Sequence, residues 1–272
     1  MIEVRNELDA LFVRSRTEER AALIPYLTGG FPEPAAFVDL AVAVLRAGAD
    51  ALEIGIPFSD PLLDGPVIQR SQHNALEAGV TPADCLRFAA EVRARIDRPL
   101  LFMGAYNPIH AYGLAAFCRA ASDAGVSGLI VPDLPVEEAD ELIAVARACK
   151  LHVIQLVAPT STDERIRRIC AAASGFIYCI SVAGVTGARG DVTTTARPLI
   201  ERVRATTDLP VAVGFGVAGP EQARAIGTFA DGIIVGSALI DAIAQSAPAS
   251  RESAAATFVA DLGRAVRRDA AR

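Results

Sequence analysis

The sequence predicts an α/β fold, a (β/α)8 barrel of the TIM type with an added N-terminal helix. Short apolar runs alternate with alanine-rich helical patterns along the chain, and eight such runs occur. Strands that alternate with helices pair in parallel through right-handed crossovers. The length of 272 residues fits one such barrel, although length alone would also fit two small domains. We therefore expect residues 1–272 to form a single barrel domain.

The predicted strands are apolar nearly throughout, as expected when both faces of a parallel sheet are covered. They lie at residues 22–28, 50–56, 99–104, 127–131, 152–157, 175–181, 210–214 and 231–235. The helical patterns include residues 33–47, 81–96, 113–124, 135–149, 162–173, 194–205 and 220–228. We favour a closed barrel because an open sheet leaves edges exposed. An open doubly wound sheet stays possible, although the first strand–helix turn lacks a G-x-G-x-x-G motif.

Two further helices bracket the repeats. Residues 2–14 place four apolar side chains on one helical face, Val4, Leu8, Leu11 and Phe12. We expect this helix to cap the floor of the barrel, where the strands begin. Residues 252–270 read as a closing amphipathic helix with basic residues late, as the helix dipole favours.

Composition excludes several classes of protein. Hydrophobic residues make up 52% of the chain, enough for a large core, and the net charge of −6 argues against nucleic acid or an anionic membrane as main partner. The five cysteines contain no C-x-x-C pair, so no disulfide framework or cysteine metal site is indicated. The first residues lack the apolar core of a signal peptide, and no apolar run is long enough to cross a bilayer. A cytoplasmic protein is expected.

Carboxylates gather after the second predicted strand, and barrel active sites lie where strands end. Glu53 falls inside a buried run, where a carboxylate is costly unless it is paired, neutral or functional. Burial raises a carboxyl pKa, which suits proton transfer near neutral pH. A core glutamate satisfied by a buried partner is the alternative. Asp60 and Asp64 follow in a loop, where turn formation is also common, and Asp64 precedes Gly65-Pro66, where it could cap a helix.

Three glycine-marked loops predict a phosphate site. They cover residues 184–187, 214–216 and 236–237, after the sixth, seventh and eighth strands. Glycine lets the backbone approach an anion, and a helix that begins at the last loop would aim free N–H groups at it. Such barrels commonly hold phosphate near the last two strands.

Other residue types argue against two mechanisms. Lys150 is the only lysine and lies before the fifth strand, on the wrong side of the barrel, so a Schiff-base aldolase is not expected. His73 is placed in a helix, His110 in a loop and His152 at the floor, so no histidine metal site is expected. Acid–base catalysis without a metal or cofactor is the remaining expectation.

The motifs resemble one family. The run LEIGIPFSDPLLDGPVIQ at residues 52–69 closely resembles the signature of the tryptophan synthase alpha chain. Further matching segments are PYLTGGFP near the start, YNP at 106–108, VPDLP at 131–135, LVAPTST at 156–162, GVTGARG at 184–190, VGFGV at 213–217 and DGIIVGSAL at 231–239. They appear in family order and cover roughly residues 20–240. The first run is highly specific, whereas many phosphate-binding barrels share the glycine loops.

The resemblance implies retro-aldol cleavage of indole-3-glycerol phosphate to indole and glyceraldehyde 3-phosphate, a step of tryptophan biosynthesis. By residue matching, Glu53 would be the general acid/base and Asp64 would accept the indole N–H. The other matched positions are the substrate contacts Tyr178, Thr186 and Phe215, and the phosphate contacts Gly187, Gly216, Gly236 and Ser237.

The resemblance also implies a partner. Family members usually work with a beta chain that holds pyridoxal phosphate and receives indole through a tunnel, so we expect no cofactor in this chain. An α2β2 tetramer is expected, with contacts near Pro57, Asp60 and Asn107. A stand-alone indole-releasing lyase and a non-catalytic activator of the beta chain are the alternatives. Retention of both Glu53 and Asp64 weighs against the non-catalytic activator. The chain departs from many relatives at Ala105, where they carry a tyrosine that would line the indole pocket.

Overall fold

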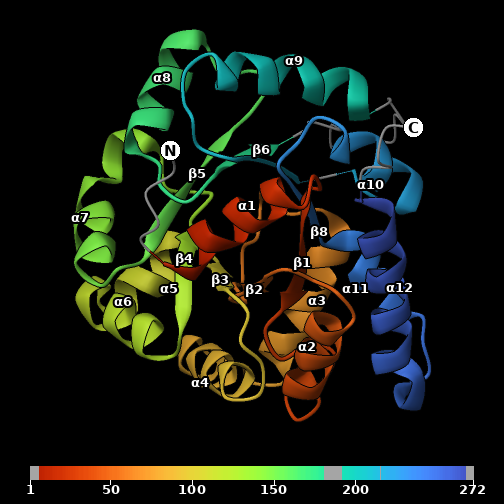
Figure 1. Cartoon of the computed structure of the whole chain (residues 1–272). Helices are drawn as coiled ribbons and strands as arrows, with labels where there is room; N and C mark the ends of the chain where they lie inside the picture. Colours follow the sequence, from red (N-terminus) through yellow and green to blue (C-terminus); the bar gives the residue numbers. More distant parts are fainter. Residues whose placement is uncertain (1–5, 181–191, 215, 268–272) are drawn as a thin grey trace.

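A closed parallel barrel forms the centre of the molecule. The computed structural model describes residues 6–180, 192–214 and 216–267. Its strands follow the chain order β1-β2-β3-β4-β5-β6-β7-β8, and β1 also pairs with β8. Figure 1 looks onto helix α1, which lies across one end of the barrel inside a ring of helices. The predicted (β/α)8 architecture with an added N-terminal helix is confirmed.

Each observed strand coincides with a predicted apolar run, with bounds that differ by at most two residues. The strands are β1 (Ala22–Thr28), β2 (Leu52–Gly55), β3 (Leu100–Met103), β4 (Val126–Ile130), β5 (His152–Val157), β6 (Ile177–Ile180), β7 (Val211–Gly214) and β8 (Gly232–Val235). Most of their residues are fully buried, because the lumen covers one face and the helices cover the other.

The helices surround these strands. They are α1 (Glu7–Thr17), α2 (Phe37–Arg46), α3 (Pro66–Glu77), α4 (Pro82–Arg93), α5 (Tyr106–Tyr112), α6 (Leu114–Asp123), α7 (Asp140–Ala148), α8 (Asp163–Ala172), α9 (Val192–Arg204), α10 (Pro220–Gly227), α11 (Ser237–Ala244) and α12 (Arg251–Ala265). Short 3-10 turns η1 (Val136–Glu138) and η2 (Pro248–Ser250) precede α7 and α12. The expected helix over 135–149 is therefore divided at Ala139, and the closing helix ends earlier than expected.

Helix α5 corrects the placement of His110, which lies in this helix and not in a loop. The carboxylate of Asp133, after β4, accepts the backbone N–H of Tyr106 at 2.9 Å. Gly113, with a φ of 94°, ends the helix in a conformation that favours glycine. The contact with Asp133 joins residues far apart in sequence, so local patterning could not reveal it.

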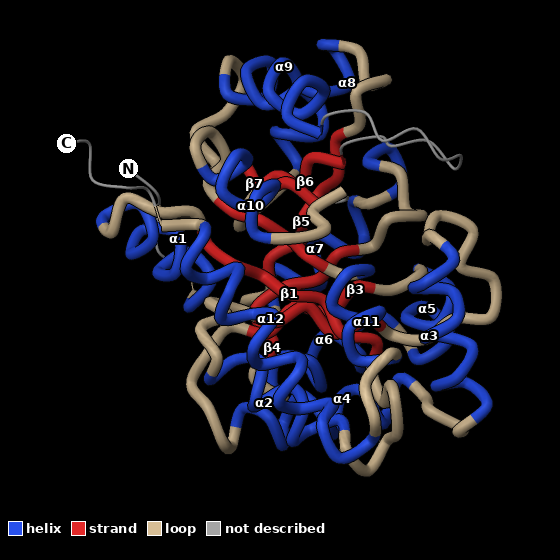
Figure 2. Tube along the Cα trace, turned by 90° about the vertical axis from the view of Figure 1, so that its right-hand side faces the viewer, coloured by secondary structure: helices blue, strands red, loops and turns tan. Residues whose placement is uncertain are grey.

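Helix α1 plugs the floor of the barrel, as predicted, although it ends at Thr17 and not at residue 14, and Val4 lies outside the residues that the structure describes. Leu8, Leu11 and Phe12 are buried in the lumen cluster, and the ring of Phe12 lies 5.4 Å from that of Phe176. A separate, larger apolar cluster fills the space between the strands and the outer helices. In Figure 2, α1 lies at the left and α3 and α5 lie at the right, at the opposite end of the barrel. The end of the barrel that lies opposite α1 is therefore supported by the packed apolar cluster in the lumen.

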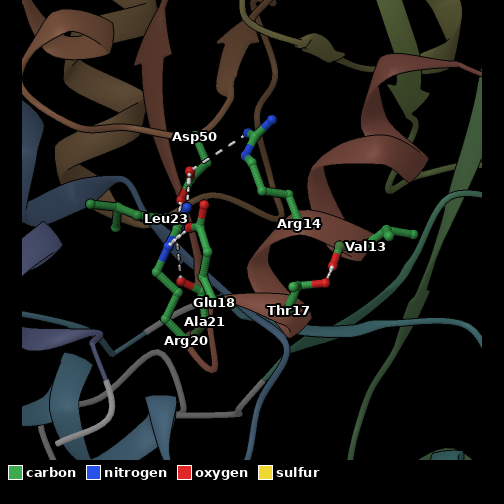
Figure 3. Close-up of polar contacts among 8 residues, drawn as sticks. All are labelled: Val13, Arg14, Thr17, Glu18, Arg20, Ala21, Leu23 and Asp50. Atoms are coloured by element: carbon green, nitrogen blue, oxygen red, sulfur yellow. Dashed lines mark hydrogen bonds and ion pairs between the residues drawn. The ribbon is translucent and has the colours of Figure 1, made fainter. Parts of the chain in front are cut away.

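Paired charges hold the floor together. His152, the first residue of β5, contacts the Asp9 carboxylate of α1 at 3.0 Å, and both side chains are buried. Arg20 donates two hydrogen bonds to Asp50, at 2.6 and 2.7 Å (Figure 3). The Asp50 carboxylate also accepts the backbone N–H of Leu23 at 2.9 Å. These contacts fix α1 and the start of β1 beneath the lumen.

Candidate active site

A pocket opens at the end of the barrel where the strands finish. Its walls come from strands β1, β2, β3, β6 and β8, from helix α3, and from the loops beside them. The lining residues are Tyr26, Glu53, Asp64, Ile68, Met103, Tyr178, Gly216, Val217, Ile234, Gly236 and Ser237. Six of the residues predicted from the sequence are thus brought together in one place.

Glu53 lies on β2 and is the most isolated charged group of this pocket. Its side chain is buried, and neither carboxylate oxygen has a hydrogen-bond partner within the described part of the chain. Burial, with a smaller contribution from the nearby Asp64, raises the pKa of Glu53 to about 8. The alternative of a core glutamate satisfied by a buried partner is therefore not supported. At neutral pH this carboxyl holds a proton that it can donate.

Asp64 faces Glu53 from the loop between β2 and α3. Its Oδ2 accepts the Nε2–H of Gln72 at 2.7 Å, and the Oε1 of the same amide accepts the N–H of Phe58 at 3.0 Å. Burial raises the pKa of Asp64, whereas the bond from Gln72 lowers it. Helix α3 begins after Gly65 with no side-chain cap. The helix-capping interpretation of Asp64 is thus not supported, and its carboxylate turns toward the pocket.

Two tyrosines frame the carboxylates. Tyr178 on β6 was predicted, and Tyr26 on β1 was not. Each ring extends over the last residue of the next strand, Gly55 for Tyr26 and Gly214 for Tyr178, and a Cβ at either glycine would collide with the phenol. Both strands therefore need glycine where they enter the pocket. Tyr26 sits in the PYLTGGFP segment, but nothing local marks its role.

Three of the residues predicted to contact phosphate, Gly216, Gly236 and Ser237, line the same pocket. Gly216 has a φ of 82°, a conformation that favours glycine, and Gly236 precedes the first residue of α11, Ser237. The first N–H groups of a helix have no partner within the helix, so this end of α11 can bind an anion. The other predicted contacts, Thr186, Gly187 and Phe215, lie outside the residues that the structure describes.

Comparison with known proteins decides the family. A family model described as tryptophan synthase alpha chain matches residues 12–267. The tryptophan synthase alpha chain of Chloroflexus aggregans is 48% identical over 97% of this chain and 99% of its own. That of Roseiflexus castenholzii is 49% identical over 91% of this chain and 95% of its own.

Solved structures agree. A tryptophan synthase structure from M. tuberculosis matches with a TM-score of 0.90 and 39% identity over 97% of this chain and 99% of that one. The alpha chain from Legionella pneumophila matches with a TM-score of 0.89 and 34% identity, over 98% and 99%. This chain belongs to the tryptophan synthase alpha chain family. Membership confirms the predicted resemblance, the alpha-subunit role and the lyase activity in tryptophan biosynthesis.

The residues expected to contact a beta chain in this family differ in exposure. Asp60 and Asn107 are exposed, whereas Pro57 is buried beneath its loop. Between Asp60 and Asp64 the same loop exposes two leucines, Leu62 at 89% and Leu63 at 62%. A solvent-facing apolar pair next to the pocket suits a surface that another protein covers.

Position 105 is where the sequence departs from the tyrosine expected for many relatives. Ala105 is the residue before α5 and is not among the described residues that line the pocket. Met103, the last residue of β3, lines it from this side.

Two features are absent from the ranges that the structure describes. Within them, no group of three or more histidine, cysteine, aspartate or glutamate side chains is arranged to hold a metal ion. None of the helices there is long and apolar enough to cross a membrane.

Proposed function

We propose that Glu53 and Asp64 divide the chemistry of indole-3-glycerol phosphate cleavage between them. The observation that carries this proposal is a buried, unpartnered Glu53 that shares the pocket with Asp64. Retro-aldol cleavage moves one proton from a glycerol hydroxyl to carbon C3 of the indole ring. It therefore requires one group that both gives and takes a proton, and one that stabilises the charge formed in between.

Glu53 is the group that moves protons. Its protonated carboxyl delivers a proton to indole C3, which leaves positive charge on the ring nitrogen. The resulting carboxylate takes the proton of the glycerol hydroxyl as the carbon–carbon bond breaks and its electron pair returns to the ring. Indole and glyceraldehyde 3-phosphate are formed, and Glu53 is protonated again. A pKa of about 8 fits both directions of transfer near neutral pH.

Asp64 stabilises the charged intermediate. An ionised carboxylate beside the ring nitrogen accepts its N–H and offsets the positive charge, in a pocket where burial strengthens electrostatic interactions. The bond from Gln72 favours this ionised form. The proposal thus assigns the two acids opposite resting states, with Glu53 protonated and Asp64 ionised against the upward effect of burial on its pKa.

Substrate binding uses separate groups. We propose that Gly216, Gly236 and Ser237 hold the phosphate together with Gly187, because the amino-terminal end of α11 and a left-handed glycine meet at the pocket wall. Tyr178 would lie against the substrate, and Thr186 and Phe215 are proposed as further contacts. Charge neutralisation at the phosphate then comes from backbone N–H groups.

The chain is proposed to work without a cofactor of its own, since the pyridoxal phosphate of this enzyme belongs to the beta chain. Alpha chains of this family work with that beta chain, and we propose an α2β2 tetramer in which Pro57, Asp60 and Asn107 lie at or near the contact. The exposed Leu62 and Leu63 support this choice of surface. A cytoplasmic location and a single domain spanning residues 1–272 complete the proposal. Both α1 and α12 pack against β1, which supports the single domain.

A stand-alone lyase that releases free indole is the second candidate. It is separated from the tetramer by purifying the chain alone and measuring indole release with and without a beta chain. A rate that rises on adding the beta chain supports the complex. A rate that is already maximal in the isolated chain supports the stand-alone enzyme.

The roles of the two acids are tested by Glu53→Gln and Asp64→Asn, with indole release and substrate binding measured on each. Glu53→Gln keeps the shape but cannot exchange protons, so turnover should fall to near background. Asp64→Asn should lose roughly 3–4 kcal/mol of transition-state stabilisation, a fall of more than about a hundredfold. Both variants should still bind substrate through the phosphate. Substantial turnover by Glu53→Gln would overturn the mechanism.

A further inference from the structure

A chain of buried hydroxyls lies behind Tyr26. The phenol oxygen is 3.2 Å from the Oγ1 of Thr28, which is 2.6 Å from the Oγ of Ser71 on helix α3. Ser71 in turn donates to the backbone carbonyl of Ile68 at 2.8 Å. All three hydroxyl-bearing side chains are buried. We call Tyr26, Thr28 and Ser71 the hydroxyl chain.

The direction of every donor in this chain follows from proton counting. A hydroxyl has one proton to donate and two lone pairs that accept. Ser71 uses its proton on a carbonyl, which cannot donate, so Thr28 must donate to Ser71. Thr28 has then spent its own proton, so Tyr26 must donate to Thr28. The single proton of the phenol therefore points away from the pocket.

The pocket side of the phenol consequently presents only lone pairs. Tyr26 lines the pocket and pairs in register with Glu53 on the adjacent strand, at the usual strand spacing of about 4.8 Å. The titratable groups that face Glu53 are Asp64 from the β2–α3 loop, Tyr26 from β1 and Tyr178 from β6. Cys85 of α4 also interacts with Tyr26. Among the described residues that line this pocket, none carries a cationic side chain.

We propose that the hydroxyl chain locks Tyr26 as a hydrogen-bond acceptor toward the pocket and so keeps the catalytic proton on Glu53. The negative end of the phenol dipole favours a neutral carboxyl and disfavours a carboxylate at that site. Tyr26 is thus a positioning residue for the proton, and Thr28 and Ser71 set the polarity of Tyr26. This inference rests on the proposed role of Glu53 and adds the device that holds it in its acid form.

The test breaks the chain without removing the phenol. Thr28→Val keeps the shape and removes the hydroxyl, so the phenol proton is released toward the pocket carboxyls. Donation to either carboxyl stabilises the ionised state of Glu53, and its pKa should fall by about one unit. The measurement is the titration of Glu53 by ¹³C NMR of glutamate-labelled protein, assigned by comparison with Glu53→Gln. The alkaline limb of kcat/KM should move to lower pH by the same amount.

Companion variants separate this device from a general packing defect. Ser71→Ala should act in the same direction, because Thr28 then turns its proton toward Tyr26. Thr28→Ser keeps the hydroxyl and should restore the wild-type titration. Tyr26→Phe should lower the pKa less than Thr28→Val, and Thr28→Val should have no further effect in a Tyr26→Phe background. Ser15→Ala, which removes a buried hydroxyl at the barrel floor, is the control and should not change the titration.

An unchanged Glu53 titration in folded Thr28→Val and Ser71→Ala would overturn the hydroxyl-chain proposal. So would an equal shift caused by Thr28→Val with and without the phenol. Because the NMR titration does not depend on turnover, either failure is distinct from a failure of the proposed function. The latter would appear as activity that survives Glu53→Gln.

Discussion

Buried carboxyl groups at the two ends of the barrel differ in whether they have a hydrogen-bond partner among the described residues. At the floor, the Asp50 carboxylate accepts two hydrogen bonds from Arg20, and Asp9 meets His152. At the other end, both carboxylate oxygens of Glu53 are buried without a partner among the described residues. The same lumen cluster lies between them. Pairing at the floor therefore serves stability, whereas the lack of pairing at the pocket leaves a proton available for chemistry.

The contrast follows from the cost of burying charge. An unpaired carboxylate loses its hydration, so burial drives it to the neutral form, whereas a partner holds it ionised. Beside Asp50 the pKa of Arg20 is raised still further above its ordinary value. Within the described part of the chain Glu53 has no such partner, and its pKa rises instead. The two ends differ in what surrounds the carboxylate and not in its depth.

The largest expected effect comes from breaking a floor pair. Asp50→Ala removes two charge-assisted hydrogen bonds from the partly buried Arg20, which then keeps Glu18 as its charged partner, and it removes the acceptor for Leu23, so the free energy of unfolding should fall by about 3–5 kcal/mol. Denaturant unfolding measures the loss, and turnover per folded molecule should be retained. Glu91→Gln breaks an exposed pair with Arg87 and should cost only about 0–1 kcal/mol. Equal losses in the two variants would refute the stabilising role of the floor pair.

Replacing Glu53 should raise the free energy of unfolding, which is the opposite of the effect of Asp50→Ala. The pKa of Glu53 is about 8 in the folded chain, against roughly 4.3 when unfolded. Wild-type stability is therefore greatest below the unfolded value and declines as pH rises toward the folded one. Glu53→Gln lacks this decline, so between pH 5 and pH 9 it should gain on the order of 4 kcal/mol relative to wild type. If the free energies of unfolding of the two proteins changed in parallel with pH across that range, this prediction would be contradicted.

A smaller effect is expected from the amide that steadies Asp64. Gln72→Met keeps the length of the side chain but loses both amide hydrogen bonds, so the pKa of Asp64 should rise and kcat should fall by roughly tenfold to a hundredfold. The matched control is Gln69→Met, because Gln69 contacts only backbone carbonyls of the same loop. Equal losses of kcat would mean that loop tethering, and not the contact to the carboxylate, matters.

The smallest effect concerns Ser15 on α1, whose buried hydroxyl has no partner in the described part of the chain. Ser15→Ala removes an unsatisfied polar group and should leave stability unchanged or raise it by about 1 kcal/mol at most. Thermal unfolding is the measurement. A clear loss would show that the floor depends on this hydroxyl.

The fold was predictable because its signals are local. Each strand is a short apolar run, and Leu8, Leu11 and Phe12 already share one helical face in the sequence. Glu53 was predictable for the same reason, since a charge inside an apolar run needs an explanation.

The contacts that tune the site were not predictable in this way. Tyr26, Thr28 and Ser71 meet only when β1 and α3 come together, and Gln72 reaches Asp64 only after α3 forms. The helix that contains His110 also depends on a contact outside its own segment, between Tyr106 and Asp133. Sequence patterns thus located the acids but not the groups that set their protonation.

The contrast between the two ends of the barrel depends most directly on the protonation state of Glu53 in the free chain. Glutamate-labelled protein titrated by ¹³C NMR, with Glu53→Gln to assign the signal, measures it without substrate or partner. We expect a carboxyl that is neutral at pH 7 and titrates near a pKa of about 8. A Glu53 that is already ionised at pH 7 would contradict the claim that the carboxyl at the pocket end of the barrel is neutral, in contrast to the paired carboxylate of Asp50 at the floor.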